Sequence, residues 1–130
     1  ISIKDWAKFI LVHLGRSGNE GVVLETDTLR TLHSPPDASV WRAGAEERGY
    51  GIPSLNYALG WYTLDIDKKE NLLWHPGGNT GFIAQAVVDP KRKNAVLLAT
   101  NVRSSHNHLF KAINRIKVHY SSLADLPGIE

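Results

Sequence analysis

Two short apolar segments, separated by one polar segment, constrain the fold of this chain more than any other feature. Residues 82–88 and 95–100 are rich in Val, Ile, Leu and Ala, and the polar residues 89–94 lie between them. Short apolar runs bounded by turn residues are typical of strands, and two such runs predict an antiparallel hairpin. The shorter run 72–75 predicts a third strand of the same sheet.

A glycine-rich segment, His75-Pro76-Gly77-Gly78-Asn79-Thr80-Gly81, connects this third strand to the hairpin. Its glycines free the backbone from the steric limits that a Cβ atom imposes, so we expect the segment to be a loop. A strand edge beside such a loop can present backbone N–H groups to a ligand. From periodicity alone, a plain meander with a glycine-rich turn is the alternative interpretation.

Three segments have the apolar spacing of helices. Residues 3–14 form the first, with Ser2 and Asp5 in a capping-box pattern. Residues 24–34 form the second, which the following prolines stop. Residues 109–120 form a helix near the C-terminus.

One further strand is predicted upstream of the glycine-rich segment. Residues 56–64 alternate in the manner of a strand, and the charged residues 65–71 form its hairpin connection. Residues 37–54 have no period and are long for a loop, which is typical of functional or disordered segments. Residues 1–130 therefore predict a single α+β domain: an antiparallel sheet of about four strands in meander order, two N-terminal helices and a C-terminal helix packed on the sheet.

Composition excludes several classes of function. Fifteen Lys and Arg against thirteen Asp and Glu leave a formal net charge of +2, which predicts neither a nucleic-acid partner nor a charged membrane surface. No apolar run approaches the ~20 residues of a membrane-spanning helix. The chain has no cysteine, and its six histidines lack the spacing of metal ligands. We therefore expect no metal and no cofactor. His13 is expected at the surface or at a boundary.

Four short motifs, in a fixed order, resemble one large enzyme family. They are Leu59-Gly60-Trp61, His75-Pro76-Gly77, Gly81-Phe82 and Ala99-Thr100-Asn101. Their order is similar to that in the C-terminal portion of serine β-lactamases and penicillin-binding proteins, particularly class C β-lactamases, D-alanyl-D-alanine carboxypeptidases and related esterases. The resemblance implies a partial β-lactamase-like fold and an extracytoplasmic location, periplasmic or secreted.

The resemblance also implies acyl transfer on ester or amide substrates. In the family, a serine in a Ser-x-x-Lys motif attacks the carbonyl, and a serine hydroxyl needs such an adjacent base. None of the nine serines here is followed by lysine three residues later, and no Tyr-x-Asn motif is present. The chain also lacks methionine. We therefore expect it to be the C-terminal part of a longer hydrolase, inactive alone, whose partner is the missing N-terminal portion.

The family's site residues map onto the glycine-rich segment. His75-Pro76-Gly77 aligns with a Lys/His-Thr/Ser-Gly motif, so His75 would orient the substrate or move a proton, and the Gly78 N–H would be one oxyanion-hole donor. Pro76, Gly77 and Asn79 would contact the substrate. Pro76 departs from the motif because it offers neither a hydroxyl nor an N–H, which favours esters or amides over β-lactams and D-alanyl peptides. For His75, a strand-end histidine bonded to backbone is the alternative.

A non-catalytic binding or interaction module, built on the same sheet, is the alternative function. The two hypotheses differ in what they predict for the sheet surface. A hydrolase fragment would leave an apolar sheet face exposed, and such a face favours homo-oligomers.

Overall fold

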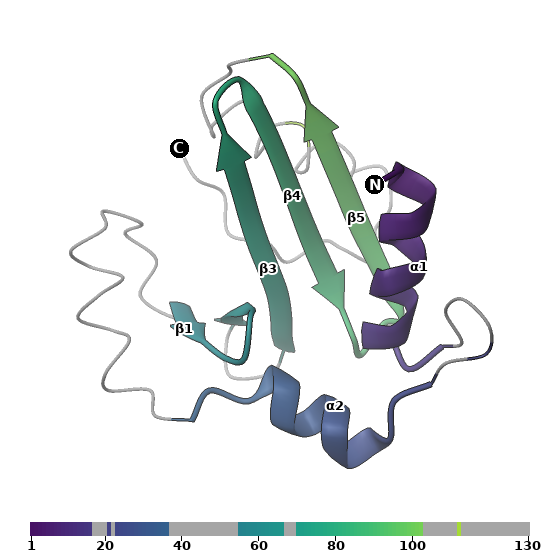
Figure 1. The fold of residues 1–130 in the computed structure, drawn as a ribbon. Coiled ribbons are helices and arrows are strands. Elements are labelled where there is room, and N and C mark those ends of the chain that lie inside the picture. The colour runs from purple at the N-terminus through teal and green to yellow at the C-terminus, as the bar shows by residue number, and fades with distance from the viewer. Residues whose placement is uncertain (17–20, 22, 37–54, 67–69, 103–111, 113–130) are drawn as a thin grey trace.

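The computed structural model describes residues 1–16, 21, 23–36, 55–66, 70–102 and 112. Within them the chain forms, in order, α1 (Ile3–His13), α2 (Thr26–His33), β1 (Leu55–Tyr57), β2 (Tyr62–Ile66), β3 (Glu70–Asn79), β4 (Phe82–Asp89) and β5 (Asn94–Thr100). The strands make one antiparallel sheet in the order β1-β2-β3-β4-β5 (Figure 1). The α+β class and the meander order are confirmed, with five strands in place of about four. The predicted helix 109–120, apart from Ala112, and the segment 37–54 lie outside the described residues.

α1 begins at the predicted cap. The Ser2 hydroxyl accepts a hydrogen bond from the Asp5 backbone N–H at 3.2 Å and donates one to the Asp5 carboxylate at 2.7 Å. The hydrogen bond from Ser2, followed by that from Lys8, lowers the pKa of the Asp5 carboxyl. A carboxylate in the first turn also suits the positive end of the helix dipole. The N-cap predicted from the sequence, Ser2, is therefore the N-cap of α1 in the structure.

The core lies between α1 and one face of the sheet, which the helix follows along β5 (Figure 1). Successive strand residues point to opposite faces, so alternate residues of β3 and β4 meet the helix. Buried side chains form this cluster: Ile10, Leu14, Trp61, Leu73, Ala86 and Val88. The opposite face is buried too, at Leu72, Trp74, Val87 and Val96. The expected exposed apolar face is therefore absent along this part of the sheet, whereas Phe82, at the other end of β4, is 64% exposed.

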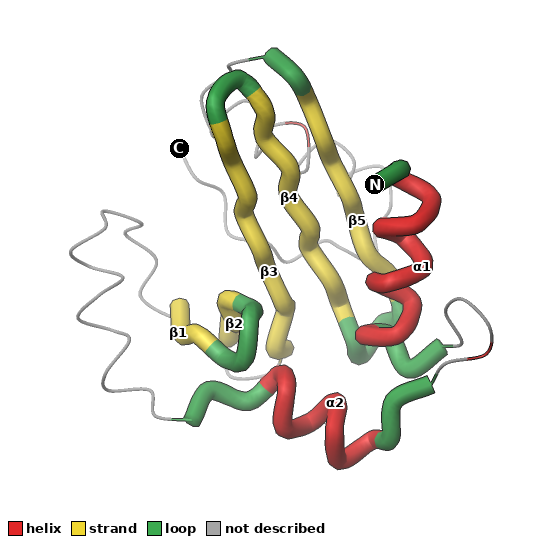
Figure 2. Tube along the Cα trace, in the orientation of Figure 1, coloured by secondary structure: helices red, strands yellow, loops and turns green. Residues whose placement is uncertain are grey.

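The predicted single strand 56–64 is wrong, because the structure divides it into β1 and β2. The Ala58 N–H donates to the Trp61 carbonyl at 2.7 Å, and Gly60 has a φ of +90°. Glycine reaches positive φ without steric cost, so Gly60 allows the chain to reverse. β2 pairs with only the first part of β3, and the short β1 pairs with the other side of β2 (Figure 2).

The predicted glycine-rich loop 75–81 is also wrong, because β3 continues to Asn79. The pairing of β3 with β4 is unbroken from Leu73 opposite Val88 to Asn79 opposite Phe82. Only Thr80 and Gly81 form the turn. Gly81 has a φ of +81°, which suits the third position of a type II turn.

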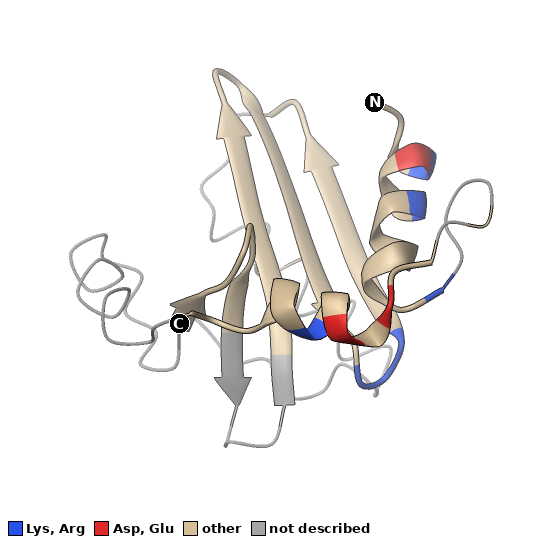
Figure 3. Ribbon diagram, turned by 60° about the horizontal axis from the view of Figure 1, so that its bottom comes forward, with Lys and Arg blue, Asp and Glu red and all other residues tan. Residues whose placement is uncertain are grey.

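The turn between β4 and β5 carries basic side chains at one end of the molecule (Figure 3). Lys91 and Lys93 are exposed, but the Lys93 ammonium donates to the Leu14 carbonyl at 2.8 Å. Because the last carbonyls of a helix lack partners within the helix, this bond caps the C-terminal end of α1.

Candidate functional site

The outer edge of β3 is open along residues 75–79. β2 pairs with β3 only from Glu70 to Trp74. Among the residues that the structure describes, no strand lies beside 75–79 on that side, while β4 pairs with all five of them on the other. The segment singled out from the sequence is therefore half of a strand whose free edge can bind a ligand.

Pro76 and Gly78 direct their backbone groups toward this open edge. A two-residue turn closes on a hydrogen-bonded pair, here Asn79 and Phe82, and backbone groups alternate in direction along a strand. The alternation directs His75, Gly77 and Asn79 toward β4. Proline is tolerated in a strand where its nitrogen faces away from a partner, in agreement with the place of Pro76. The Gly78 N–H is thus left as a donor on the open edge.

The His75 side chain is exposed on the face of the sheet that carries α1. It stands opposite Ala86, a core residue of that face. Its ring is edge-on to the Trp61 indole, with the ring centroids 6.1 Å apart. No described residue makes a hydrogen bond to the His75 ring, so the structure gives no support to the alternative of a backbone-bonded histidine.

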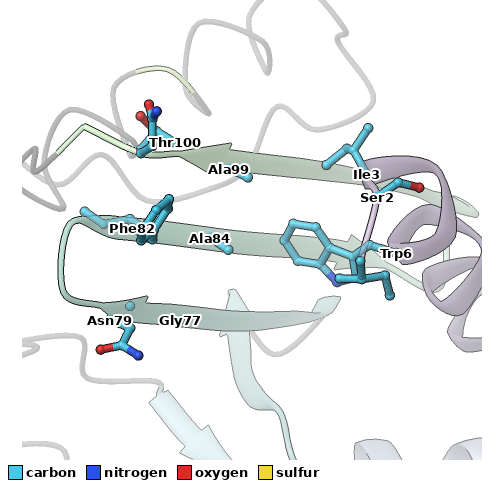
Figure 4. Close-up of a pocket in the computed structure, with 13 residues that line it drawn as sticks. Ser2, Ile3, Trp6, Gly77, Asn79, Phe82, Ala84, Ala99 and Thr100 are labelled. Carbon is cyan, nitrogen blue, oxygen red and sulfur yellow. The ribbon is translucent and has the colours of Figure 1, made fainter.

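Two cavities lie on this face. One of about 850 Å³ is formed by Gly77, Gly78 and Asn79 together with Phe82 and the beginning of α1 (Figure 4). The other, of about 500 Å³, contains His75. The Trp6 ring belongs to both cavities. The structure therefore gathers three of the five predicted residues in one cavity, puts His75 in the next, and leaves Pro76 out of both.

His13 is a residue of the second cavity that the sequence analysis missed. It was expected at the surface or at a boundary, but it is 7% exposed, and the expectation is wrong. Its position follows Trp6 by seven residues and Ile10 by three, which is the spacing of one helix face. This spacing indicates that His13 lies on the buried face of α1. A polar residue is ordinarily expected at the surface, which is why the spacing was not used.

His13 is also bonded to a second histidine, and this pair joins α1 to α2. His13 Nδ1 and His33 Nε2 are 2.9 Å apart. Burial lowers the pKa of both imidazoles, and the charge that His13 can carry further lowers the pKa of His33, to about 4. Phe9 and Trp61 stand edge-on to the His13 ring, with centroids 4.8 and 5.0 Å away. Both rings are therefore mainly neutral at pH 7.

We expect the free energy of unfolding to fall as the pH is lowered from 6.5 to 4. In that window the unfolded chain protonates His33 while the folded chain does not, so protons favour the unfolded state. One pKa unit is worth about 1.4 kcal/mol, and partial exposure of the ring reduces the expected loss to about 1–2 kcal/mol. Urea unfolding at pH 7.5, 6 and 5 measures it.

The matched variants are His33→Gln and Arg30→Gln, on the same helix. His33→Gln should remove most of the loss between pH 7.5 and 5, because no imidazole is left at that position to titrate. Arg30 is exposed and does not titrate in this range, so Arg30→Gln should keep the loss. An undiminished loss in His33→Gln would show that another group is responsible.

The described part of the chain contains neither a membrane-spanning helix nor a cluster of metal ligands. None of its helices has the length and apolar character needed to cross a membrane. It holds no group of three or more His, Asp or Glu residues able to bind a metal ion. Comparison of the chain with protein-family models, curated proteins and solved structures found no match.

Proposed function

We propose that this chain is the C-terminal portion of a serine hydrolase of the β-lactamase and penicillin-binding-protein group, and that the open edge of β3 is its share of the active site. The observation that carries the proposal is this edge, where the Gly78 N–H faces outward and the exposed His75 lies three residues earlier. The order of the four sequence motifs also supports it.

The open edge suits acyl transfer because the carbonyl oxygen of the substrate gains negative charge in the transition state. A preorganised N–H at that oxygen contributes about 3–4 kcal/mol to transition-state stabilisation. In our proposal the Gly78 N–H is one such donor. The His75 imidazole orients the substrate or transfers a proton, as exposed imidazoles beside a reacting group can do.

The proposed substrates are esters or amides. Pro76 has no hydroxyl to bind a substrate carboxylate, which disfavours β-lactams and D-alanyl peptides. The nucleophilic serine and its lysine are assigned to polypeptide outside these 130 residues, which contain no Ser-x-x-Lys motif. The family resemblance favours an extracytoplasmic location for the whole protein.

The test compares two proteins, the 130-residue chain and the proposed longer protein of the same reading frame. Each is assayed with 4-nitrophenyl acetate and a chromogenic cephalosporin. We expect ester turnover only from the longer protein, and its loss when the serine of Ser-x-x-Lys is changed to alanine. A reading frame without that motif, or serine-dependent hydrolysis by the short chain alone, would refute the proposal.

The same edge, together with the buried apolar residues on the face of the sheet opposite α1, favours a second candidate, a non-catalytic module that binds an extended peptide. A free strand edge can add a peptide as a further strand through backbone hydrogen bonds. In this case the longer protein would bind peptides without hydrolysing esters. Hydrogen exchange at Gly78 would slow in the presence of such a peptide, and this would distinguish the two candidates.

A further inference from the structure

The cavity beside His75, here called the Trp61 cavity, is almost entirely apolar and aromatic. Its volume is about 500 Å³, within the range of small-molecule sites. Trp6 and Phe9 of α1, Leu32 of α2, and Leu59 and Trp61 of the turn between β1 and β2 form most of its wall. His75 stands at its rim, exposed.

Apolar and aromatic side chains dominate the described wall of the Trp61 cavity. No Asp, Glu, Lys or Arg is among its described wall residues. Its one buried imidazole, that of His13, is already bonded to His33, and burial holds its pKa low. A charged group moved from water into this cavity would lose hydration without gaining an Asp, Glu, Lys or Arg partner from the described wall, whereas an uncharged ring has little hydration to lose.

Apolar surface at this cavity is still in contact with water. Phe9 and Leu59 are 53% and 54% exposed, although both belong to its wall. A bound ring would cover these side chains, and burial of apolar surface is favourable. Trp61 already meets His13 and His75 edge-on, and aromatic groups prefer such geometry, so a ring suits the cavity better than an alkyl chain.

We propose that the Trp61 cavity binds an uncharged aromatic group of a small ligand, with its polar end at His75. If the proposed function holds, on which this part of the inference rests, the ring is the acyl group of an ester or amide whose carbonyl meets the β3 edge. His75 belongs to both the open edge of β3 and the wall of the Trp61 cavity. In this proposal, the bond between the aromatic ring and the carbonyl of the ligand therefore lies at His75.

The test is a titration of the 130-residue chain with methyl 2-naphthoate, followed by the indole N–H signals in NMR. We expect shifts at Trp6 and Trp61 and none at Trp74, which lies outside the cavity wall. Sodium 2-naphthoate, which has the same ring and a negative charge, should bind at least about tenfold more weakly.

Matched variants test the location. Phe9→Glu adds a charge to the wall and should weaken binding of methyl 2-naphthoate at least about tenfold. Val23→Glu, at a residue outside both cavities that is 55% exposed against 53% for Phe9, should leave binding unchanged. Leu59→Glu repeats the test from the turn between β1 and β2, in case Phe9→Glu does not fold.

Equal binding by the wild-type chain, Phe9→Glu and Leu59→Glu would overturn the inference, as would equal affinity for the ester and the anion. Its failure is distinguishable from failure of the proposed function. Ester hydrolysis by the longer protein without naphthoate binding would support the proposed function and refute the Trp61 cavity as a ligand site. Binding without any hydrolysis would support the cavity as a ligand site and remove the catalytic role.

Discussion

Replacing Gly78 by proline is expected to lower the kcat of the proposed longer hydrolase by about 10²- to 10³-fold, the effect of removing one oxyanion-hole donor. Proline has no N–H, so this change deletes the proposed donor and leaves the rest of the backbone in place. The strand should tolerate it, because the Gly78 nitrogen faces the open edge. Pro76, two residues earlier in β3, already has the same orientation.

Gly78→Ala is the matched control, since alanine keeps the N–H. Gly78 is not among the glycines with positive φ, and a Cβ there would have the Phe82 carbonyl oxygen as its nearest neighbour at 3.7 Å, an ordinary contact. Its kcat should stay near that of the wild type. Measured kcat, KM and melting temperature decide between the outcomes. Equal losses of kcat in both variants would indicate a steric effect. An unchanged kcat in Gly78→Pro would show that the Gly78 N–H is not an oxyanion-hole donor.

The elements best predicted from the sequence are those whose signal is local. The apolar run 82–88 became β4 (Phe82–Asp89), and 95–100 became β5 (Asn94–Thr100), each with one residue added. α1 begins after Ser2 because that cap needs only a side chain and a backbone N–H within three residues. Signals of this kind do not depend on the rest of the fold.

The glycine-rich half of β3 could not be predicted in the same way. Gly77 and Gly78 have low intrinsic preference for strands, and Pro76 removes a donor. They are held in the strand by the register with β4, which is set by apolar residues elsewhere in the hairpin. Tertiary pairing therefore overrides local preference here. In the segment 56–64, by contrast, a local feature overrides the regular alternation that predicted one strand. The chain turns at Gly60, which has a positive φ, and the strand is divided in two.

The residues proposed for the candidate site come from the sequence, whereas their geometry comes only from the structure. The sequence indicated His75 and Gly78, which the structure places on one strand beside the open edge. It could not show that His75 and Gly77 belong to different cavities, because that division depends on where Trp6 of α1 packs. Trp61 was part of a motif, but its contact with His75 arises only when the β1–β2 turn closes.

Asp89 is a buried anchor that the sequence analysis treated as part of a polar connection. It ends β4 with 1% exposure. One carboxylate oxygen accepts the Arg92 backbone N–H at 2.8 Å, and the other accepts from the Arg92 guanidinium at 3.0 Å. Both bonds lie within three residues, so Asp89 and Arg92 together fix the turn that carries Lys93. That lysine in turn caps α1 at Leu14.

Asp89→Ala is expected to lower the free energy of unfolding by about 3 kcal/mol, at the lower end of values for buried ion pairs because Arg92 keeps 29% exposure. Asp89→Asn keeps an acceptor for the Arg92 N–H and should cost about 1–2 kcal/mol. Urea unfolding at pH 7.5 measures both.

The ranking of these two variants tests whether the carboxylate's charge contributes. Equal losses would assign the effect to the negative charge, because asparagine keeps the shape of aspartate and lacks only the charge. A loss under about 1 kcal/mol in Asp89→Ala would mean that this ion pair contributes no more than an exposed one. Because the same turn carries the Lys93 cap, Asp89→Ala should also speed hydrogen exchange at the last turn of α1. Exchange at the first turn, which Ser2 caps independently, should remain as in the wild type.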